Sequence, residues 1–262
     1  MRERYHRMGQ AARLALFASV LMAASTAWAT PKTIVDDTHE GPTADNSIGD
    51  GEYGASTTGI NSGFGNVIGS TSTLWVDSGV DGTLGFALES GGAELNDAVV
   101  IYVDSLPDVG VGSTENLTDT GDLHRKAVSG TNGSERAQLT FAPGFAADYA
   151  IAFDKEFAGL WKLKENDSHE FDMGGVAFSP TGSTTGPWEL TVQLEQLGLE
   201  PGGSFKYVVT YINEETAFRA DELHGVAPGG AITENPGHVP ASLAEGDFVT
   251  FRTARPWAWL DG

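Results

Sequence analysis

Carboxylate side chains are the most abundant chemically active groups of this chain, and several gather where turn residues are frequent. The sequence holds 36 Asp and Glu against 15 Lys and Arg, for a net charge of −21. Asp50 and Glu52 precede the first short apolar runs, whereas Asp104 and Asp108 follow the apolar run at 98–103. Calcium takes about six to eight oxygen ligands from flexible loops. We therefore predict a structural Ca²⁺ site among these four carboxylates, with solvated turn residues as the alternative interpretation.

Tryptophan side chains are the second group with a recognisable chemistry. A flat aromatic face binds the C–H surface of a sugar through dispersion and burial. Trp75 precedes a turn, Trp161 alternates with the charged Lys162, and Trp257 and Trp259 stand two residues apart near the C-terminus. We predict that these four tryptophans bind a glycan. The alternative for the last two is that they hold the terminus against the domain.

Residue patterns of common enzyme classes are missing from the sequence. There is no cysteine, no G-x-S-x-G elbow for a serine nucleophile and no H-E-x-x-H zinc motif. The densest mixed cluster of charged groups is interpreted as a salt-bridged loop; it consists of Arg219, Asp221, Glu222 and His224. We expect a binding protein rather than an enzyme. A carbohydrate-active enzyme with paired carboxylates stays an alternative, because so many acidic residues allow many pairs.

The first 29 residues have the three parts of a secretory signal peptide. Four arginines precede an apolar run from Leu14 to Ala24, and Ala27-Trp28-Ala29 follows as an A-x-A cleavage site. The run is shorter than the about 20 residues that cross a bilayer. We therefore expect a secreted or periplasmic protein without a membrane span. Its negative charge disfavours nucleic acid as a partner, an extracellular glycan is the expected partner, and the oligomeric state stays open.

The remainder of the chain divides into three parts that differ in residue composition. Residues 30–46 are polar, with prolines and a glycine, and are expected to be flexible. Residues 47–253 carry short apolar runs broken by Gly, Asp, Asn and Pro, which is typical of a β-sandwich. Residues 254–262 form a C-terminal tail. The long polar segments 104–135 and 213–247 are the first places to expect recognition, because loops of such length are uncommon unless functional or disordered.

Several strands are predicted from the periodicity of apolar residues and from residues that favour turns. Asp81-Gly82 predicts a hairpin between 74–76 and 83–88, since both turn positions tolerate positive φ. The run at 98–103 is apolar at every position, as in a strand covered on both faces. From Trp188 to Leu194 apolar and polar residues alternate, which predicts a strand with one buried face. Further strands are expected at 149–153, 157–163, 205–212 and 248–251.

The order of these segments resembles that of secreted bacterial β-sandwich proteins. The matching stretches are DGTLGFALES at 81–90, VVIYVDS at 99–105 and FAPGFAADYA at 141–150. The chain is similar, more distantly, to family 9 carbohydrate-binding modules and DOMON-like domains, which open on Asp-Gly and close on a tryptophan strand followed by LGL-x-PG, as at 188–202. The resemblance implies an antiparallel, jelly-roll-like β-sandwich, often calcium-bearing and sometimes sugar-binding. A structural or surface-assembly protein is the alternative function.

Overall fold

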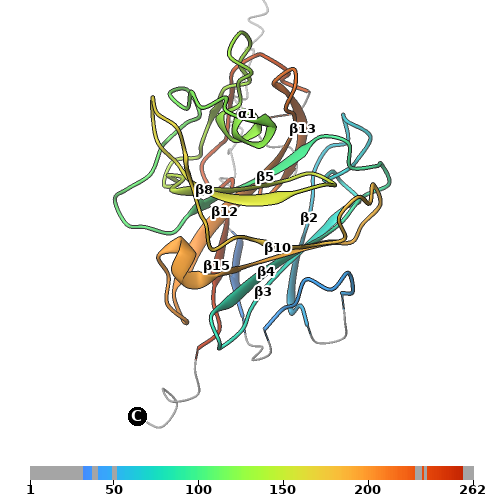
Figure 1. The fold of residues 1–262 in the computed structure, drawn as a ribbon, viewed down its shortest axis with the longest axis vertical. Helices are drawn as coiled ribbons and strands as arrows, with labels where there is room; N and C mark the ends of the chain where they lie inside the picture. Colours follow the sequence, from blue (N-terminus) through green and yellow to red (C-terminus); the bar gives the residue numbers. More distant parts are fainter. Residues whose placement is uncertain (1–31, 37–40, 49–51, 228–231, 233–234, 256–262) are drawn as a thin grey trace, which may run out of the picture.

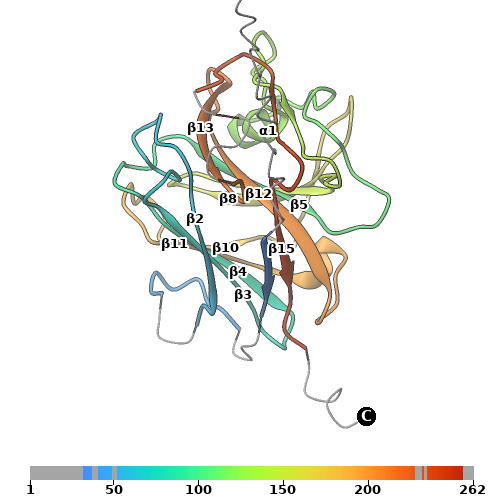
Figure 2. The same ribbon diagram turned by 180° about the vertical axis from the view of Figure 1, so that it is seen from behind.

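The computed structural model describes residues 32–36, 41–48, 52–227, 232 and 235–255. Two β-sheets face each other, and a layer of loops with one short helix, α1 (Leu123–Ser129), covers the outer face of the larger sheet (Figures 1 and 2). The protein is an all-β sandwich, as predicted, with a third and irregular layer. Within the described residues, no helix combines the length and apolar character needed to span a membrane.

The smaller sheet is antiparallel throughout, with the strand order β10–β11–β4–β3–β2. The predicted hairpin joins β3 to β4: Gly82 has a φ of +89°, and Asp81 Oδ1 accepts a hydrogen bond from the amide of Thr83 at 3.0 Å. Glycine adopts this φ without steric cost. The strands are β2 (Ala55–Thr58), β3 (Thr73–Ser78), β4 (Thr83–Glu89), β10 (Ala177–Ser179) and β11 (Trp188–Gln193).

The larger sheet has the order β1–β15–β12–β5–β7–β8–β9, and β13 also pairs with β12. The uniformly apolar run becomes β5, a central strand buried on both faces, as the sequence predicts. The strands are β1 (Lys32–Val35), β5 (Ala98–Asp104), β7 (Tyr149–Phe153), β8 (Ala158–Lys162), β9 (Glu170–Phe171), β12 (Ser204–Asn213), β13 (Phe218–His224) and β15 (Val249–Arg252). A separate short pair joins β6 (Leu139–Thr140) to β14 (Ala241–Ser242).

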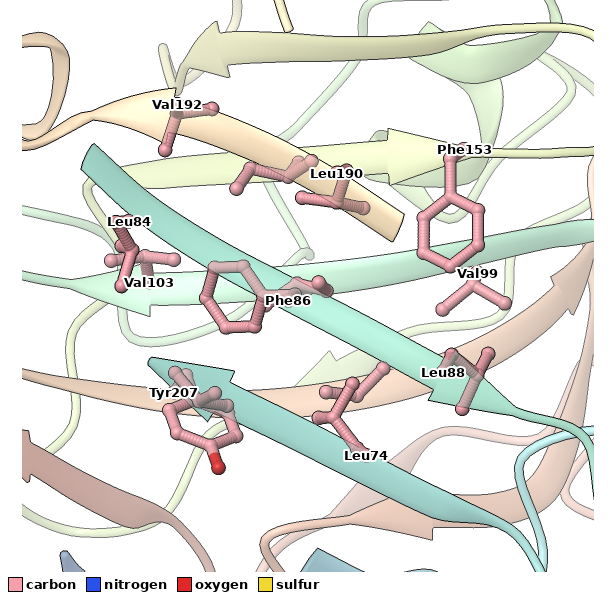
Figure 3. Packing of buried hydrophobic residues seen from close by; sticks show 14 of the residues in the cluster. Leu74, Leu84, Phe86, Leu88, Val99, Val103, Phe153, Leu190, Val192 and Tyr207 are labelled. Carbon is pink, nitrogen blue, oxygen red and sulfur yellow. The ribbon is translucent and has the colours of Figure 1, made fainter. Parts of the chain in front are cut away.

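The main hydrophobic core lies between the two sheets (Figure 3). From the smaller sheet, Leu84, Phe86 and Leu88 of β4 and Leu190 and Val192 of β11 are almost fully buried. They face a matching set on the larger sheet: Val99, Val103, Phe153 and Tyr207. The alternation predicted for 188–194 is thus confirmed. A one-turn 3-10 helix, η1 (Leu194–Leu197), follows β11 and ends at Gly198, whose φ is +67°.

A second core lies on the opposite face of the larger sheet. The long segments 104–135 and 213–247, expected to be recognition loops, supply much of it and fold over β5, β7 and β12. Tyr102 of β5 shows the attachment: its hydroxyl donates to the carbonyl of Val128 in α1 at 2.9 Å, and its ring packs edge-on against Phe141. Much of these segments therefore covers the sheet.

The N-terminal segment differs from expectation. We predicted little regular structure for residues 30–46, but Lys32–Val35 forms β1, which pairs in parallel with β15 at the edge of the larger sheet. The prediction is wrong for these four residues because the pairing partner lies more than 200 residues away, where local patterning carries no signal. The pair also makes the larger sheet mixed rather than purely antiparallel.

Candidate functional site

A recess of about 300 Å³ lies at one end of the larger sheet, beside β8 and β9. Tyr149, Lys162 and Glu170 are cross-strand neighbours on β7, β8 and β9, so their side chains share one face of the sheet. The loop after β9 and the turn η1 close the other sides. We call this site the β8–β9 recess; its lining residues are Tyr149, Lys162, Glu170, Phe171, Asp172, Met173 and Gln196.

Gln196 of η1 fixes the wall of the β8–β9 recess. Its Nε2 donates to Asp172 Oδ1 at 2.8 Å and to the carbonyl of Gly175 at 3.1 Å, and its Oε1 accepts from the amide of Gln193 at 2.6 Å. Asp172 Oδ1 also accepts from the amide of Gly174 at 2.7 Å. Both hydrogen bonds to the Asp172 carboxylate use Oδ1, so Oδ2 has no protein donor among the described residues. The loop backbone is therefore held while a carboxylate oxygen is left for a ligand.

The other polar groups of the β8–β9 recess are mostly uncommitted. Within the described residues, the Lys162 ammonium makes neither a hydrogen bond nor an ion pair, while its backbone pairs with the neighbouring strands. Glu170 makes a single ion pair with Lys164 at 3.4 Å, and both side chains are exposed, so this pair is weak. Burial raises the pKa of Tyr149, as do the negative charges of Asp148, Asp172 and Glu170. The phenol is thus a protonated hydrogen-bond donor that lies close to two carboxylates of the recess.

A second recess of similar volume, about 300 Å³, has its charged groups already paired with each other. Here Lys206 Nζ pairs with Asp104 Oδ2 at 3.0 Å and donates to the carbonyl of Gly144 at 2.5 Å. Asp104 was predicted to ligate calcium, but its charge is neutralised by this lysine. Asp108, predicted with it, is exposed in a turn with a φ of 58° and does not line the recess.

The structure brings a different set of carboxylates together on the outer face of the smaller sheet. Asp45, Glu52 and Glu189 each place an oxygen within 4.8 Å of the others. Glu52 was a predicted ligand and Asp45 lies in the same segment, whereas Glu189 was missed and Asp50 lies outside the described residues. Of the predicted set, Glu52, Asp104 and Asp108 are therefore not gathered, because Glu52 lies beside Glu189 of the smaller sheet whereas Asp104 ends β5 of the larger sheet.

Glu189 is fully buried although it points away from the main core. Its Oε2 accepts hydrogen bonds from the amides of Asp45, Asn46 and Ser47 at 3.1, 2.5 and 2.9 Å. Its Oε1 is buried without a hydrogen bond of ordinary geometry in the described residues, and the buried Tyr53 hydroxyl, whose pKa Glu189 helps to raise, lies near this carboxylate. Burial raises the pKa of Glu189, the amides oppose that shift, and the charges of Glu52 and Asp45 add to it. The group could hold a cation, which would offset the repulsion between like charges.

The predicted tryptophans occupy three different situations. Trp75 is half-buried on the outer face of the smaller sheet, between Ser56 and Ala87 of the neighbouring strands. Trp161 is 2% exposed and packs against Phe157, Phe171 and His124, so its ring faces are closed to a ligand. Trp257 and Trp259 lie outside the described residues. Trp75 therefore remains the one described tryptophan of the predicted set with an accessible ring.

A buried serine and histidine lie close enough to resemble a nucleophile and its base. Ser129 Oγ is 2.9 Å from His169 Nε2. The bonds around them exclude that chemistry, because Ser129 Oγ donates to the carbonyl of Asp119 and His169 Nδ1 accepts from the amide of Lys164. The ring proton is thus on Nε2 and points at the serine. Burial lowers the pKa of His169 to about 4, so the pair is structural.

The charged cluster on β13 is also structural, and the prediction of a salt-bridged loop is wrong. Arg219, Glu222 and His224 are fully buried in a strand. The Arg219 guanidinium donates to Thr210 Oγ1 and to the carbonyl of Ala137. No ion pair links the members of this cluster among the described residues. Sequence alone cannot show this, because charge spacing does not reveal which backbone groups approach.

The acidic members of β13 anchor a distant loop. Glu222 accepts the amides of Phe64, Asn66 and Ile68 at 2.7–2.9 Å, and Asp221 accepts that of Gly63 at 2.8 Å. Carboxylates bound by backbone amides in this way fix a loop without doing chemistry.

Comparison with known proteins gives similarity at the level of fold. No protein-family model matches the chain, and no curated protein does. Solved structures that are similar include a candidate carbohydrate-binding protein from Bacteroides uniformis, at 9% identity and a TM-score of 0.42, which covers 86% of this chain and 100% of that one. They also include a family 9 carbohydrate-binding module from Caldicellulosiruptor kristjanssonii in complex with cellotriose, at 12% identity and a TM-score of 0.38, which covers 82% of this chain and 94% of that one. The expected resemblance is thus found, at low identity. Neither similarity assigns a ligand or a residue to this chain.

Proposed function

We propose that this protein is an extracellular, non-enzymatic carbohydrate-binding protein whose site is the β8–β9 recess. The observation that carries the proposal is the combination, in one recess of about 300 Å³, of uncommitted polar groups with apolar surface. Lys162 and Tyr149 offer donors and Asp172 and Glu170 offer acceptors, and sugar hydroxyls need both. Small-molecule sites span about 300–1,000 Å³, so this volume suits a short saccharide unit.

Charge supports a neutral ligand. The whole chain carries −21, so a polyanionic ligand would approach against a repulsive field. In the β8–β9 recess, one lysine stands beside two carboxylates, which adds no attraction for anions. A neutral glycan avoids the repulsion and still uses every polar group.

Glycan binding at this recess is tested with the exported chain, residues 30–262, on a glycan array and on polysaccharide affinity gels. We expect at least one neutral glycan to bind, and Lys162→Ala or Asp172→Ala to weaken that binding about tenfold or more, since each removes about 1.4 kcal/mol or more of interaction. The matched controls are Lys155→Ala, in the turn at the far end of β8, and Asp167→Ala, in an exposed turn.

Other outcomes identify the competing functions. Failure to bind any glycan, together with concentration-dependent oligomers, would favour a surface-assembly protein. Release of sugar products would favour a carbohydrate-active enzyme. Binding that is unchanged in both recess variants would contradict the proposed site.

We also propose that Asp45, Glu52 and Glu189 bind Ca²⁺ as a structural ion. Support comes from the mutual approach of three carboxylates and from the buried Glu189 oxygen without a hydrogen bond of ordinary geometry in the described residues. A ligand bound only by the folded state raises its stability, so added Ca²⁺ should raise the melting temperature and a chelator should reverse the effect. Glu189→Gln, which keeps an acceptor oxygen, should abolish the calcium response. An identical melting temperature with calcium and with chelator would contradict the proposal.

A further inference from the structure

Met173 is an unusual residue on the rim of the β8–β9 recess. It is 87% exposed, whereas the other exposed large apolar side chains of the described residues are between 39% and 67% exposed. A single exposed apolar side chain is common on protein surfaces, but Met173 lines a recess in which most of the other side chains are polar or charged. Its position therefore suggests contact with a bound molecule.

The backbone beneath Met173 is held in place. Asp172 Oδ1 accepts the amide of Gly174 at 2.7 Å, and Gln196 Nε2 bonds to both Asp172 and Gly175, on either side of the methionine. The loop thus presents the thioether from a fixed base. Methionine is unbranched and polarizable, so it adapts to an irregular apolar surface.

The recess needs such a contact because neither of its aromatic rings is freely exposed: Phe171 is half-buried and packs against Trp161. Tyr149 is only 8% exposed, and the groups beside it are charged or polar: Lys162, Glu170, Asp172 and Gln196. These side chains can bond to hydroxyls, but a sugar also has a C–H face that requires an apolar partner. Met173 is the exposed apolar side chain on the recess.

Met173 also holds the only sulfur atom of the described residues. The sequence has four methionines and no cysteine, and the other three, Met1, Met8 and Met22, lie in the expected signal peptide. Once that segment is removed, one thioether is the sole site of sulfur oxidation. Its exposure makes it accessible to an oxidant.

We propose that Met173 is the apolar contact of the β8–β9 recess with the ligand, and that oxidation of its sulfur to the sulfoxide switches binding off; this rests on the proposed function. With hydrogen peroxide as oxidant, a sulfur lone pair attacks one peroxide oxygen, the O–O bond breaks and an S–O bond forms. The sulfur loses two electrons, the proton of the attacked oxygen passes to the other peroxide oxygen, and that oxygen leaves as water. The product is polar, and methionine sulfoxide reductases reverse it.

The test compares the affinity for the bound glycan before and after hydrogen peroxide treatment of the exported chain. Mass spectrometry should find one added oxygen on the peptide that contains Met173. We expect affinity to fall about tenfold or more, which corresponds to about 1.4 kcal/mol, and to recover after treatment with methionine sulfoxide reductase. In Met173→Leu, the ratio of affinities before and after peroxide should be one, whatever the starting affinity.

The possible failures are distinguishable. If the untreated protein binds glycan and full oxidation of Met173 leaves the affinity unchanged, the role of Met173 is refuted while the proposed function stands. If Met173→Leu loses affinity on peroxide treatment, another oxidised residue is responsible and the inference is wrong. If the untreated protein binds no glycan at all, the proposed function fails and this inference fails with it.

Discussion

At the scale of single residues, two buried histidines make the stability of the folded state depend on pH. His224 is fully buried, with Thr57 Oγ1 at 3.0 Å from Nδ1 and Ser72 Oγ at 2.8 Å from Nε2. Burial lowers the pKa of His224 to about 3, and that of His169 to about 4. Both values lie well below the value of about 6.5 expected for an unfolded chain. The unfolded state therefore binds these two protons first as the pH falls.

This predicts that the contribution of the two histidines to the free energy of unfolding decreases as the pH falls from about 6.5 to 4. Each histidine adds a slope of about 1.4 kcal/mol per pH unit, because the unfolded state holds one more proton in that window. The contribution is fully present above pH 6.5. Urea titrations at a series of pH values measure the slope. In His169→Gln, the slope of the free energy of unfolding against pH should be smaller than in the wild type by the amount that one proton contributes. An unchanged slope would contradict the role given to His169.

Single residues also show the limit of sequence reasoning about the site. The alternation from Trp188 to Leu194 correctly places Glu189 on the face away from the main core. It cannot show that Asp45, Asn46 and Ser47 cover that face and bury the carboxylate. Trp161 was expected to be accessible, but it is buried. Strand alternation does not reveal that a second layer packs on the outer face of the sheet.

At the scale of elements, local patterning predicts strands whose own residues supply the signal. β4, β5, β7 and β11 were predicted because period, uniform apolarity and the Asp81-Gly82 turn are encoded within about ten residues. The β8–β9 recess carries no such signal. Its residues come from three strands, a loop and η1, and they meet only because the register aligns Tyr149 with Lys162 and Lys162 with Glu170.

The N-terminal strand β1 provides a test at this scale. Ile34 is 8% exposed and joins the main core, while its neighbour Val35 is 61% exposed. Ile34→Asp should lower the free energy of unfolding by about 3 kcal/mol or more, through lost apolar burial and an unpaired buried charge. Val35→Thr keeps the β-branched shape at an exposed position and is the control.

Loss of β1 should also affect association, because it leaves the edge of β15 unpaired. An open edge is a template for pairing with a second chain. Ile34→Asp is thus expected to give larger species in size-exclusion chromatography, whereas Val35→Thr is not. A variant Ile34→Asp with wild-type stability and wild-type elution would show that β1 does not secure this edge.

At the scale of the whole molecule, the two hydrophobic cores have different structural roles. The core between the sheets fixes the strand register, and the core beneath α1 and the long segments immobilises the outer face of the larger sheet. The end of that sheet at Tyr149, Lys162 and Glu170 is left open as a recess. The β-sandwich expected from the sequence is thus confirmed, but the recognition surface is proposed at a sheet end rather than in the longest loops.

The most direct measurement is an amide chemical-shift map of ¹⁵N-labelled protein, residues 30–262, during titration with the glycan found on the array. We predict that the largest shifts cluster at the end of β8, at β9, at residues 172–175 and at η1, while the amide signals around Trp75 do not shift. Shifts centred on β2, β3 and β4 around Trp75, with none at Lys162 and Asp172, would contradict it.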